Sequence, residues 1–410
     1  MTSTSIRLKL LALFVAVVLS ACGGSSGGPA SSPAGGITVV PGNGQVTVSW
    51  TPDSGVQYWL WYAPGSTVTT STPGHLTKVN VSSPYVLTGL TNGVTYSFAI
   101  NGRTGGGAGG ALSSSVSVVP RPAATTWTTG TSMGSAEIRS VTYGSAADAS
   151  LNYLAVGASG SVFKGSDGIN WAAVSTAPSV NFNATLFTLS QFIALSSTGG
   201  INNIYRTADF VTWTAAVTNP ATGQNLNALA SNGALVVAVG DNGTIQTSTD
   251  GISWTTATSV PTTDHLYGVT YAASGLWLAV GANGVLFTSV DGKSWTARAS
   301  GTTNTLRSVA ASTYLTGYQY VAVGLGGVVS RSVDGTSFAV QTLGTTDFYG
   351  VNADPLQILA VGSGGAAYTS SDAVTWTSQT TGTTNKLAGV FGSPTQYIAV
   401  GAAGTNISSR

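Results

Sequence analysis

A repeat of about forty residues, running from Trp127 to the end of the chain, limits what this sequence can fold into. Its clearest copy is residues 278–295, and residues 237–254 have nearly the same sequence. An aromatic residue recurs every 38 to 44 residues, at Trp127, Trp171, Trp213, Trp254, Trp295, Phe338 and Trp376. This regular spacing indicates a fold built from stacked copies of one small unit.

Each unit has the pattern of four short strands and no helical pattern. Residues 306–309 and 320–323 are the first two strands of one copy, and a Gly-x-x-Gly turn, a third strand, an Asp-Gly turn and the aromatic strand follow. A four-stranded unit cannot bury both of its faces alone, so the units must pack against one another in a ring. The sequence therefore predicts a β-propeller over residues 125–410.

The two ends of the repeat region predict the number of blades. The last unit stops without its aromatic strand, whereas the region begins with an isolated strand, residues 125–129, that contains Trp127. This strand fits the gap, so we expect seven blades with the N-terminal strand completing the last one. Closing the ring in this way leaves no open sheet edge to pair with other chains.

The Asp-Gly turn of each unit resembles a known repeat. Ser248-Thr249-Asp250-Gly251-Ile252-Ser253-Trp254 is similar to the Asp-box, or BNR, repeat of sialidases and of other propellers, including photosystem II assembly factors. The equivalent aspartates are Asp167, Asp209, Asp250, Asp291, Asp334 and Asp372. The carboxylate accepts backbone N–H groups and the glycine supplies a positive φ, so we expect structural turns rather than catalytic or metal sites. Phe210 and Ala373 replace the glycine in two copies, whose turns should be poorer.

Residues 1–21 have the pattern of a bacterial export signal, with Arg7 and Lys9 before an apolar run too short to span a bilayer comfortably. The run ends in Leu19-Ser20-Ala21-Cys22, which resembles the lipobox of bacterial lipoproteins. The resemblance implies cleavage before Cys22 and acylation of this residue, hence a membrane-anchored envelope lipoprotein. Because Gly23 rather than Asp follows, we expect the outer membrane in a Gram-negative host. A plain secretory signal with an incidental cysteine is the alternative.

Two further segments separate the anchor from the propeller. After Cys22, residues 23–35 contain only Gly, Ser, Pro and Ala, so residues 22–35 are a flexible tether. Short alternating strands in residues 36–119 predict a β-sandwich. Residues 87–100, with Tyr96 at the start of a strand, resemble the E–F corner and F strand of fibronectin type III domains, with Trp50 as the core tryptophan. Residues 120–124 form a stiff proline-containing linker, and the whole chain is predicted to be all-β.

Composition excludes several classes of function. Charged residues make up 7% of the chain and the net charge is +1, so nothing points to nucleic acid or to an anionic membrane surface. His75 and His265 have no partner at metal-binding spacing, and Cys22 is the only cysteine. The Gly-x-x-Gly turns are not phosphate loops because no helix follows them. We therefore expect a monomer without a metal or cofactor.

A polar ring is the candidate binding site, because the first strand of each propeller blade lines the central channel. Its non-core position reads Arg139, Asn183, Asn227, Tyr267, Arg307, Tyr349 and Ala388, and the position two residues earlier reads Glu137, Asn181, Asn225, His265, Thr305, Asp347 and Lys386. Of these, Glu137, Arg139, Asn183, Asn227, His265, Tyr267, Arg307, Asp347, Tyr349 and Lys386 are the candidate ligand-binding residues. The arginines suit a carboxylate or phosphate and the tyrosines a sugar or peptide. A water-filled channel without a ligand is the alternative.

Variation within this ring, on a uniform framework, favours non-catalytic recognition of an envelope protein, an unfolded client or a glycan. The similarity to assembly factors favours a protein partner. The alternative is a sialidase-like hydrolase using Glu137 and Asp347, because glycoside hydrolysis needs two carboxylates about 5–10 Å apart. The sialidase family also uses an arginine triad and a Tyr–Glu pair, and Glu137 is the only glutamate of the repeat region. We therefore expect no enzymatic activity.

Overall fold

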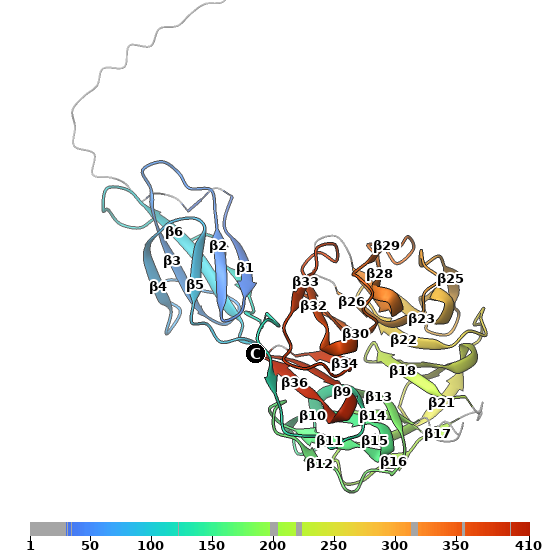
Figure 1. The fold of residues 1–410 in the computed structure, drawn as a ribbon. Helices are drawn as coiled ribbons and strands as arrows, with labels where there is room; N and C mark the ends of the chain where they lie inside the picture. Colours follow the sequence, from blue (N-terminus) through green and yellow to red (C-terminus); the bar gives the residue numbers. More distant parts are fainter. Residues whose placement is uncertain are drawn as a thin grey trace, which may run out of the picture. The chain divides into compact units, whose positions relative to one another are not determined.

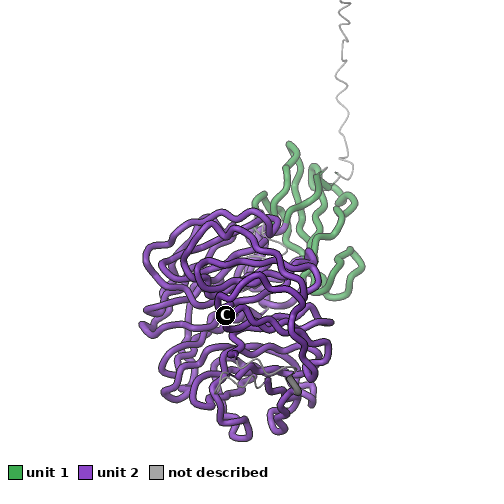
Figure 2. The backbone as a smooth tube through the Cα atoms, turned by 90° about the vertical axis from the view of Figure 1, so that its right-hand side faces the viewer, with its two compact units in different colours: residues 1–38, 48–85, 96–117 green, residues 39–47, 86–95, 118–410 purple. Residues whose placement is uncertain are grey.

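The computed structural model describes residues 30, 32–33, 35–121, 123–196, 204–218, 224–312, 319–354, 357–393 and 395–410. The predicted export signal, the predicted lipidation site Cys22 and most of the tether lie outside these residues. Figure 2 shows the described residues as two compact units, one made of the described parts of residues 1–38, 48–85 and 96–117 and the other of those of residues 39–47, 86–95 and 118–410. Within the described residues, no helix has the length and apolar character needed to cross a membrane.

The described residues between 35 and 121 form seven short strands. They are β1 (Thr38–Gly42), β2 (Gln45–Ser49), β3 (Gln57–Pro64), β4 (Leu76–Val81), β5 (Tyr85–Thr88), β6 (Tyr96–Arg103) and β7 (Val116–Val118). One sheet has the order β1-β2-β5 and the other the order β4-β3-β6-β7. Along β3, buried Tyr58, Leu60 and Tyr62 alternate with half-buried Trp59 and Trp61, because successive side chains of a strand point to opposite faces.

The rest of the described chain is a β-propeller of seven sheets (Figure 1). The innermost strands of blades 1 to 7 are β9 (Ile138–Ser145), β13 (Phe182–Thr188), β18 (Leu226–Ser231), β22 (Leu266–Tyr271), β26 (Leu306–Ala311), β30 (Phe348–Ala353) and β34 (Leu387–Gly392). The second strands are β10 (Leu151–Gly157), β14 (Gln191–Ser196), β19 (Val236–Gly240), β23 (Trp277–Gly281), β27 (Tyr320–Gly324), β31 (Ile358–Gly362) and β35 (Tyr397–Gly401).

The outer halves of the blades follow the same order. The third strands are β11 (Val162–Gly165), β15 (Ile204–Thr207), β20 (Ile245–Ser248), β24 (Leu286–Ser289), β28 (Val328–Ser332), β32 (Ala367–Ser370) and β36 (Asn406–Ser409). The fourth strands are β12 (Ala172–Ala173), β16 (Thr214–Ala215), β21 (Ser253–Thr256), β25 (Thr296–Arg298), β29 (Ala339–Thr342), β33 (Thr377–Gln379) and β8 (Thr128–Thr129). In blade 3 a fifth strand, β17 (Val217–Thr218), pairs in parallel with β21.

The ring closes through its N-terminal strand, as the isolated aromatic segment predicts. Strand β8 pairs with β36, with Thr129 opposite Ile407 and Thr128 opposite Ser408, and completes the sheet of blade 7. The innermost strand of this blade, β34, lies beside β9 of blade 1. Five of the second strands, β19, β23, β27, β31 and β35, are buried at every position because a sheet packs on each of their faces, which explains their continuous apolar sequence.

Short 3-10 turns join the second and third strands of six blades. They are η1 (Ala158–Gly160), η2 (Asp241–Gly243), η3 (Ala282–Gly284), η4 (Leu325–Gly327), η5 (Ser363–Gly365) and η6 (Ala402–Gly404). Each turn contacts the innermost strand of the next blade. In all six, the middle residue has a positive φ, between 52° and 70°.

The Asp-box aspartates hold turns between the third and outer strands. In blade 3, Asp250 Oδ1 accepts the backbone N–H groups of Ile252 and Ser253 at 2.7 and 2.8 Å. These two hydrogen bonds hold the pKa of Asp250 below its usual range, because the charged form accepts them better. The following Trp254 is fully buried, and packs in one cluster with core residues of blade 2.

The two boxes that lack glycine form the same turn, so the expectation of poorer turns is wrong for their geometry. Asp209 Oδ1 accepts from Val211 and Thr212 at 2.9 and 2.7 Å, as Asp250 does from its own neighbours. Phe210 and Ala373 take φ of 61° and 59° in place of glycine. The hydrogen bonds of the box therefore impose the left-handed conformation on residues that rarely adopt it.

Candidate functional site

A β-bulge in the innermost strand of every blade presents one side chain to the central channel. Between Leu226 and Ala228 of β18, for example, the register with β19 shifts, which leaves Asn227 as the extra, unpaired residue. The same shift singles out Arg139, Asn183, Asn227, Tyr267, Arg307, Tyr349 and Ala388. A bulge of this kind changes the direction of one side chain relative to the regular up-and-down alternation of a strand, and here each of the seven inner strands contains one.

All seven bulge residues line one cavity of about 650 Å³. Glu137 and Lys386, from the position two residues earlier, line it as well. Small residues follow the bulge because neighbouring inner strands approach closely: a Cβ on Gly389 would lie 2.5 Å from the carbonyl oxygen of Arg139. The structure thus brings nine of the residues named from the sequence into one channel, with two tyrosines, three cations and one carboxylate among them.

The carboxylate joins blades 1 and 7. Glu137 Oε2 accepts from Arg139 Nε at 3.2 Å, and its other oxygen pairs with the ammonium group of Lys386. Burial alone would raise the pKa of Glu137, but the hydrogen bonds and charges of Lys386 and Arg139 outweigh it and hold the pKa below its ordinary value. Glu137 is therefore a fixed anion that neutralises its neighbours.

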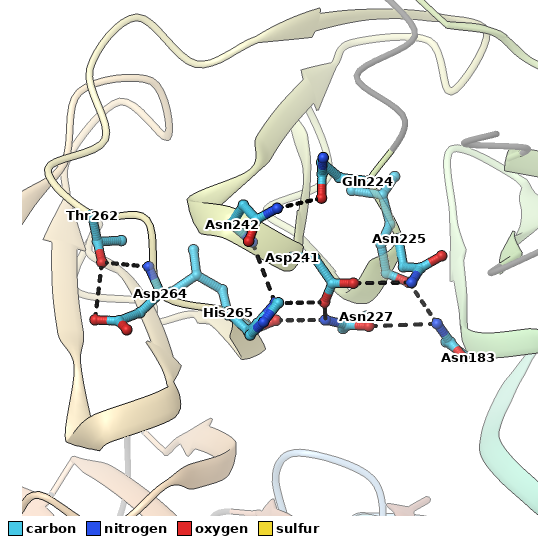
Figure 3. Close-up of polar contacts among 11 residues, drawn as sticks. Asn183, Gln224, Asn225, Asn227, Asp241, Asn242, Thr262, Asp264 and His265 are labelled. Atoms are coloured by element: carbon cyan, nitrogen blue, oxygen red, sulfur yellow. Dashed lines mark hydrogen bonds and ion pairs between the residues drawn. The ribbon is translucent and has the colours of Figure 1, made fainter. Parts of the chain in front are cut away.

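A chain of amides continues this network around the channel (Figure 3). Arg139 Nη1 donates to Asn183 Oδ1 at 2.9 Å, and Asn183 Nδ2 donates to the Leu226 carbonyl at 2.9 Å. Asn227 Nδ2 lies 3.0 Å from Asp241 Oδ1, and His265 Nδ1 lies 3.1 Å from the same oxygen. The polar groups of blades 1 to 3 are thus largely satisfied by one another.

The opposite part of the channel has a different character. The guanidinium of Arg307 lies over the ring of Tyr267, 4.3 Å from its centroid, and Lys386 Nζ lies 4.9 Å from the centroid of Tyr349. Arg307 Nε is buried and has no hydrogen-bond partner. Within the described residues, Arg307 has no carboxylate at ion-pair distance either. Its charge faces the cavity without compensation.

Two candidate residues, Asp347 and His265, do not line the cavity. Asp347 Oδ1 accepts the backbone N–H of Gly326 at 2.8 Å, in turn η4 of the preceding blade, and His265 contacts Asp241 in turn η2. Asn181 does the same for Ser159 of η1, at 2.7 Å. Asp347 and His265 thus accept N–H groups of the neighbouring turn, whereas Glu137 and Lys386, at the equivalent position, line the cavity. Whether Asp347 and His265 contact a ligand stays a prediction.

Asp241 is a residue of the network that sequence reasoning missed. It accepts from Asn225 Nδ2 at 2.9 Å as well as from Asn227. The corresponding first residues of the other 3-10 turns are Ala158, Ala282, Leu325, Ser363 and Ala402. A single charged residue at an otherwise uncharged repeat position was the signal that would have found it.

The two carboxylates of the hydrolase hypothesis are not brought together as a catalytic pair. Glu137 lines the cavity as a paired anion, whereas Asp347 caps a backbone turn and is not part of the cavity wall. Within the described residues, no three His, Cys, Asp or Glu side chains gather in a way that would hold a metal ion. The channel offers donors, cations and aromatic rings, which are means of binding.

Fold and site together define a β-propeller with a polar channel, and comparison with known proteins agrees with this class. Residues 179–305 match the family described as DUF6242 beta propeller domain. No curated protein matches the chain.

Solved structures share the propeller fold. YCF48 from Cyanidioschyzon merolae has a TM-score of 0.56 at 16% identity, covering 69% of this chain and 98% of that one. A structure of YCF48 bound to D1 peptide has a TM-score of 0.56 at 15% identity, covering 70% and 94%. The WD40 beta propeller domain of Doa1 has a TM-score of 0.54 at 11% identity, covering 70% and 96%. At such identities the likeness shows the fold alone.

Proposed function

We propose that the propeller is a non-catalytic binding platform that receives a peptide segment of a protein partner at the mouth of its channel. The observation that carries the proposal is the ring of bulge residues: a repeated framework presents seven side chains of four different types to one cavity of about 650 Å³. A cavity of this volume suits a small ligand or a chain segment rather than a folded domain. The similar YCF48 structure that contains a D1 peptide supports a peptide as the ligand class.

A hydrolase is the less favoured function. Its general acid would have to hold a proton near neutral pH, which requires a raised pKa. The pKa of Glu137 is instead lowered by Lys386 and Arg139, so this residue stays ionised. Turnover of any fluorogenic glycoside by the purified protein, lost on Glu137→Gln, would overturn the non-catalytic proposal.

We further propose that the chain is an envelope lipoprotein anchored through acylated Cys22 and that residues 36–119 are a fibronectin type III spacer. The strand order of three plus four, β1-β2-β5 and β4-β3-β6-β7, supports such a module, since the type III sandwich divides its seven strands in this way. Metabolic labelling with an alkynyl fatty acid tests the anchor. Labelling that persists in a Cys22→Ser variant would refute it.

The platform itself is tested by photo-crosslinking in intact cells. A photoreactive amino acid at Tyr267 or Tyr349, which line the channel, should crosslink one defined protein. The same probe at Ser253, an exposed residue of outer strand β21, is the matched control. Adducts that are absent at the channel positions, or equal at Ser253, would count against a peptide-binding channel.

A further inference from the structure

Arg307 is the one cation of the channel that the described protein leaves without a hydrogen bond or ion pair. Lys386 and Arg139 both pair with Glu137. Arg307 lies over the face of Tyr267, and its Nε is buried without a hydrogen-bond partner. A buried donor that is not satisfied is energetically costly, so an arrangement of this kind points to an acceptor that arrives from outside.

The charge balance of the cavity sets the sign of that acceptor. Its wall contains the three cations and one carboxylate, which leaves a net charge of +2. Glu137 offsets one of the two cations of blades 1 and 7, so that sector keeps one positive charge, and Arg307 supplies the other from blade 5, where no carboxylate of the described residues lines the cavity. An anionic group is therefore the ligand that the Arg307 side of the channel attracts.

We propose that Arg307, flanked by Tyr267 and Tyr349, binds a carboxylate group of the peptide that the channel receives; this inference rests on the proposed peptide-binding function. The guanidinium fork matches a planar carboxylate, to which it donates two parallel hydrogen bonds. Blade 1 contains an arginine–carboxylate pair inside the protein, since Arg139, at the equivalent bulge, donates one hydrogen bond from Nε to Glu137 at 3.2 Å. In blade 5 the ligand supplies the carboxylate.

The geometry also defines what surrounds the bound carboxylate. Tyr267 and Tyr349 come from the blades on either side of Arg307, so their rings flank the carboxylate position and leave the open cavity in front of it. A chain terminus or an acidic side chain reaches this position equally well. The two sources share one chemistry, and the experiment distinguishes them.

The purified full chain is tested first with succinate, a carboxylate without a peptide. The readout is the Nε–Hε signal of Arg307 in the ¹⁵N–¹H spectrum, which its loss in Arg307→Gln assigns. Succinate should shift this signal, and R307Q should weaken succinate binding about 10–100-fold, because a charge-assisted hydrogen bond is removed. Arg298→Gln, in outer strand β25, removes an equal charge outside the cavity and should bind succinate like the wild type.

A second arm uses synthetic hexapeptide pools with either a free or an amidated C-terminus. Retention of the free-acid pool alone by the wild type, lost in R307Q, identifies a terminal carboxylate. Retention of both pools only when they contain Asp or Glu, again lost in R307Q, identifies a side-chain carboxylate.

The two arms separate the possible failures. Pools without any carboxylate that are retained equally by wild type and R307Q would overturn the carboxylate inference and leave peptide binding intact. Succinate binding without retention of either pool would overturn the peptide ligand and leave a small-carboxylate site. An Arg307 signal that succinate does not move, or that inorganic phosphate moves at lower concentration, would overturn the assignment to carboxylate.

Discussion

Blades 1 and 5 have nearly the same local sequence around their channel arginines, but the two arginines make different contacts. Ile138-Arg139-Ser140-Val141 and Leu306-Arg307-Ser308-Val309 occupy matching strands and matching bulges. The residue two positions before the arginine differs, Glu137 in one blade and Thr305 in the other. Their backbones are equivalent, because the carbonyls of Glu137 and Thr305 accept from the first residues of η1 and η4 at 2.8 and 2.9 Å.

The comparison shows how a repeat framework separates fold from binding. The bulge positions an arginine in the channel in both blades. One neighbouring side chain decides whether the charge of this arginine is neutralised by an ion pair within the protein. In blade 1 the carboxylate is present and the arginine becomes part of a fixed network with Asn183. In blade 5 it is absent, and the arginine remains available. The charge that a blade presents to the channel therefore depends on side chains that the repeat does not specify.

The strongest way to break the comparison is to give blade 5 the carboxylate of blade 1. Thr305→Glu should place an acidic side chain beside Arg307, in the position from which Glu137 holds Arg139. Intramolecular pairing would then compete with the ligand, so succinate binding should fall about 10–100-fold, which titration followed at the Arg307 signal measures.

The neighbouring Thr303→Glu is the control for T305E, because Thr303 is exposed and precedes the strand. It adds the same charge in the same loop and should bind succinate with nearly unchanged affinity. If both variants lose binding equally, general repulsion rather than local pairing is responsible, and the blade 1 geometry does not transfer.

The reverse change removes the carboxylate from blade 1. Glu137→Gln leaves Arg139 and Lys386 without their anion, so the free energy of unfolding should fall by about 1–2 kcal/mol, a value discounted for the partial exposure of all three side chains. Urea unfolding measures it. The variant should also bind a second equivalent of succinate, because blade 1 then resembles blade 5.

The pH dependence of stability checks the origin of this loss. The pKa of Glu137 is lowered in the folded state, so its stabilising contribution is complete above the unfolded value of about 4.3 and disappears as the pH falls through the lower folded value. The gap between wild type and E137Q should be largest near neutrality and close in strong acid. A gap that is independent of pH would mean that packing, not charge, was lost.

Much of the propeller could be predicted because its information is periodic. The aromatic residues, beginning with Trp127, and the Asp-Gly turns recur at a regular spacing. Such a repeat indicates the architecture even where one copy departs from the pattern. The seven bulge residues could also be named, since one position varied while the framework did not. Whether they contact a ligand stays a prediction.

The partners of the site residues could not be predicted, because they depend on the neighbouring blade. Alternation along a strand indicates a face, but it does not tell whether a side chain before the bulge lies in the channel, as Glu137 does, or binds the neighbouring turn, as Asp347 does. Asp347 accepts the backbone N–H of Gly326, and Asp241 accepts hydrogen bonds from the side-chain amides of blade 3. These contacts join residues 14 to 21 positions apart in the chain, and no local pattern encodes them.

The smallest expected effect concerns the aromatic ring under Arg307, which sharpens the comparison further. Among the described residues, no aromatic ring stacks on Arg139, whereas Tyr267 lies 4.3 Å from the Arg307 guanidinium carbon. The contact is worth about 0.5–1 kcal/mol at a partly exposed site, so Tyr267→Leu should weaken succinate binding about 2–5-fold. Tyr267→Phe keeps the ring and should bind like the wild type. A loss in Tyr267→Phe as large as in Tyr267→Leu would show that the phenol hydroxyl contacts the ligand, so that Tyr267 would act as a hydrogen-bonding group and not as the ring that supports Arg307.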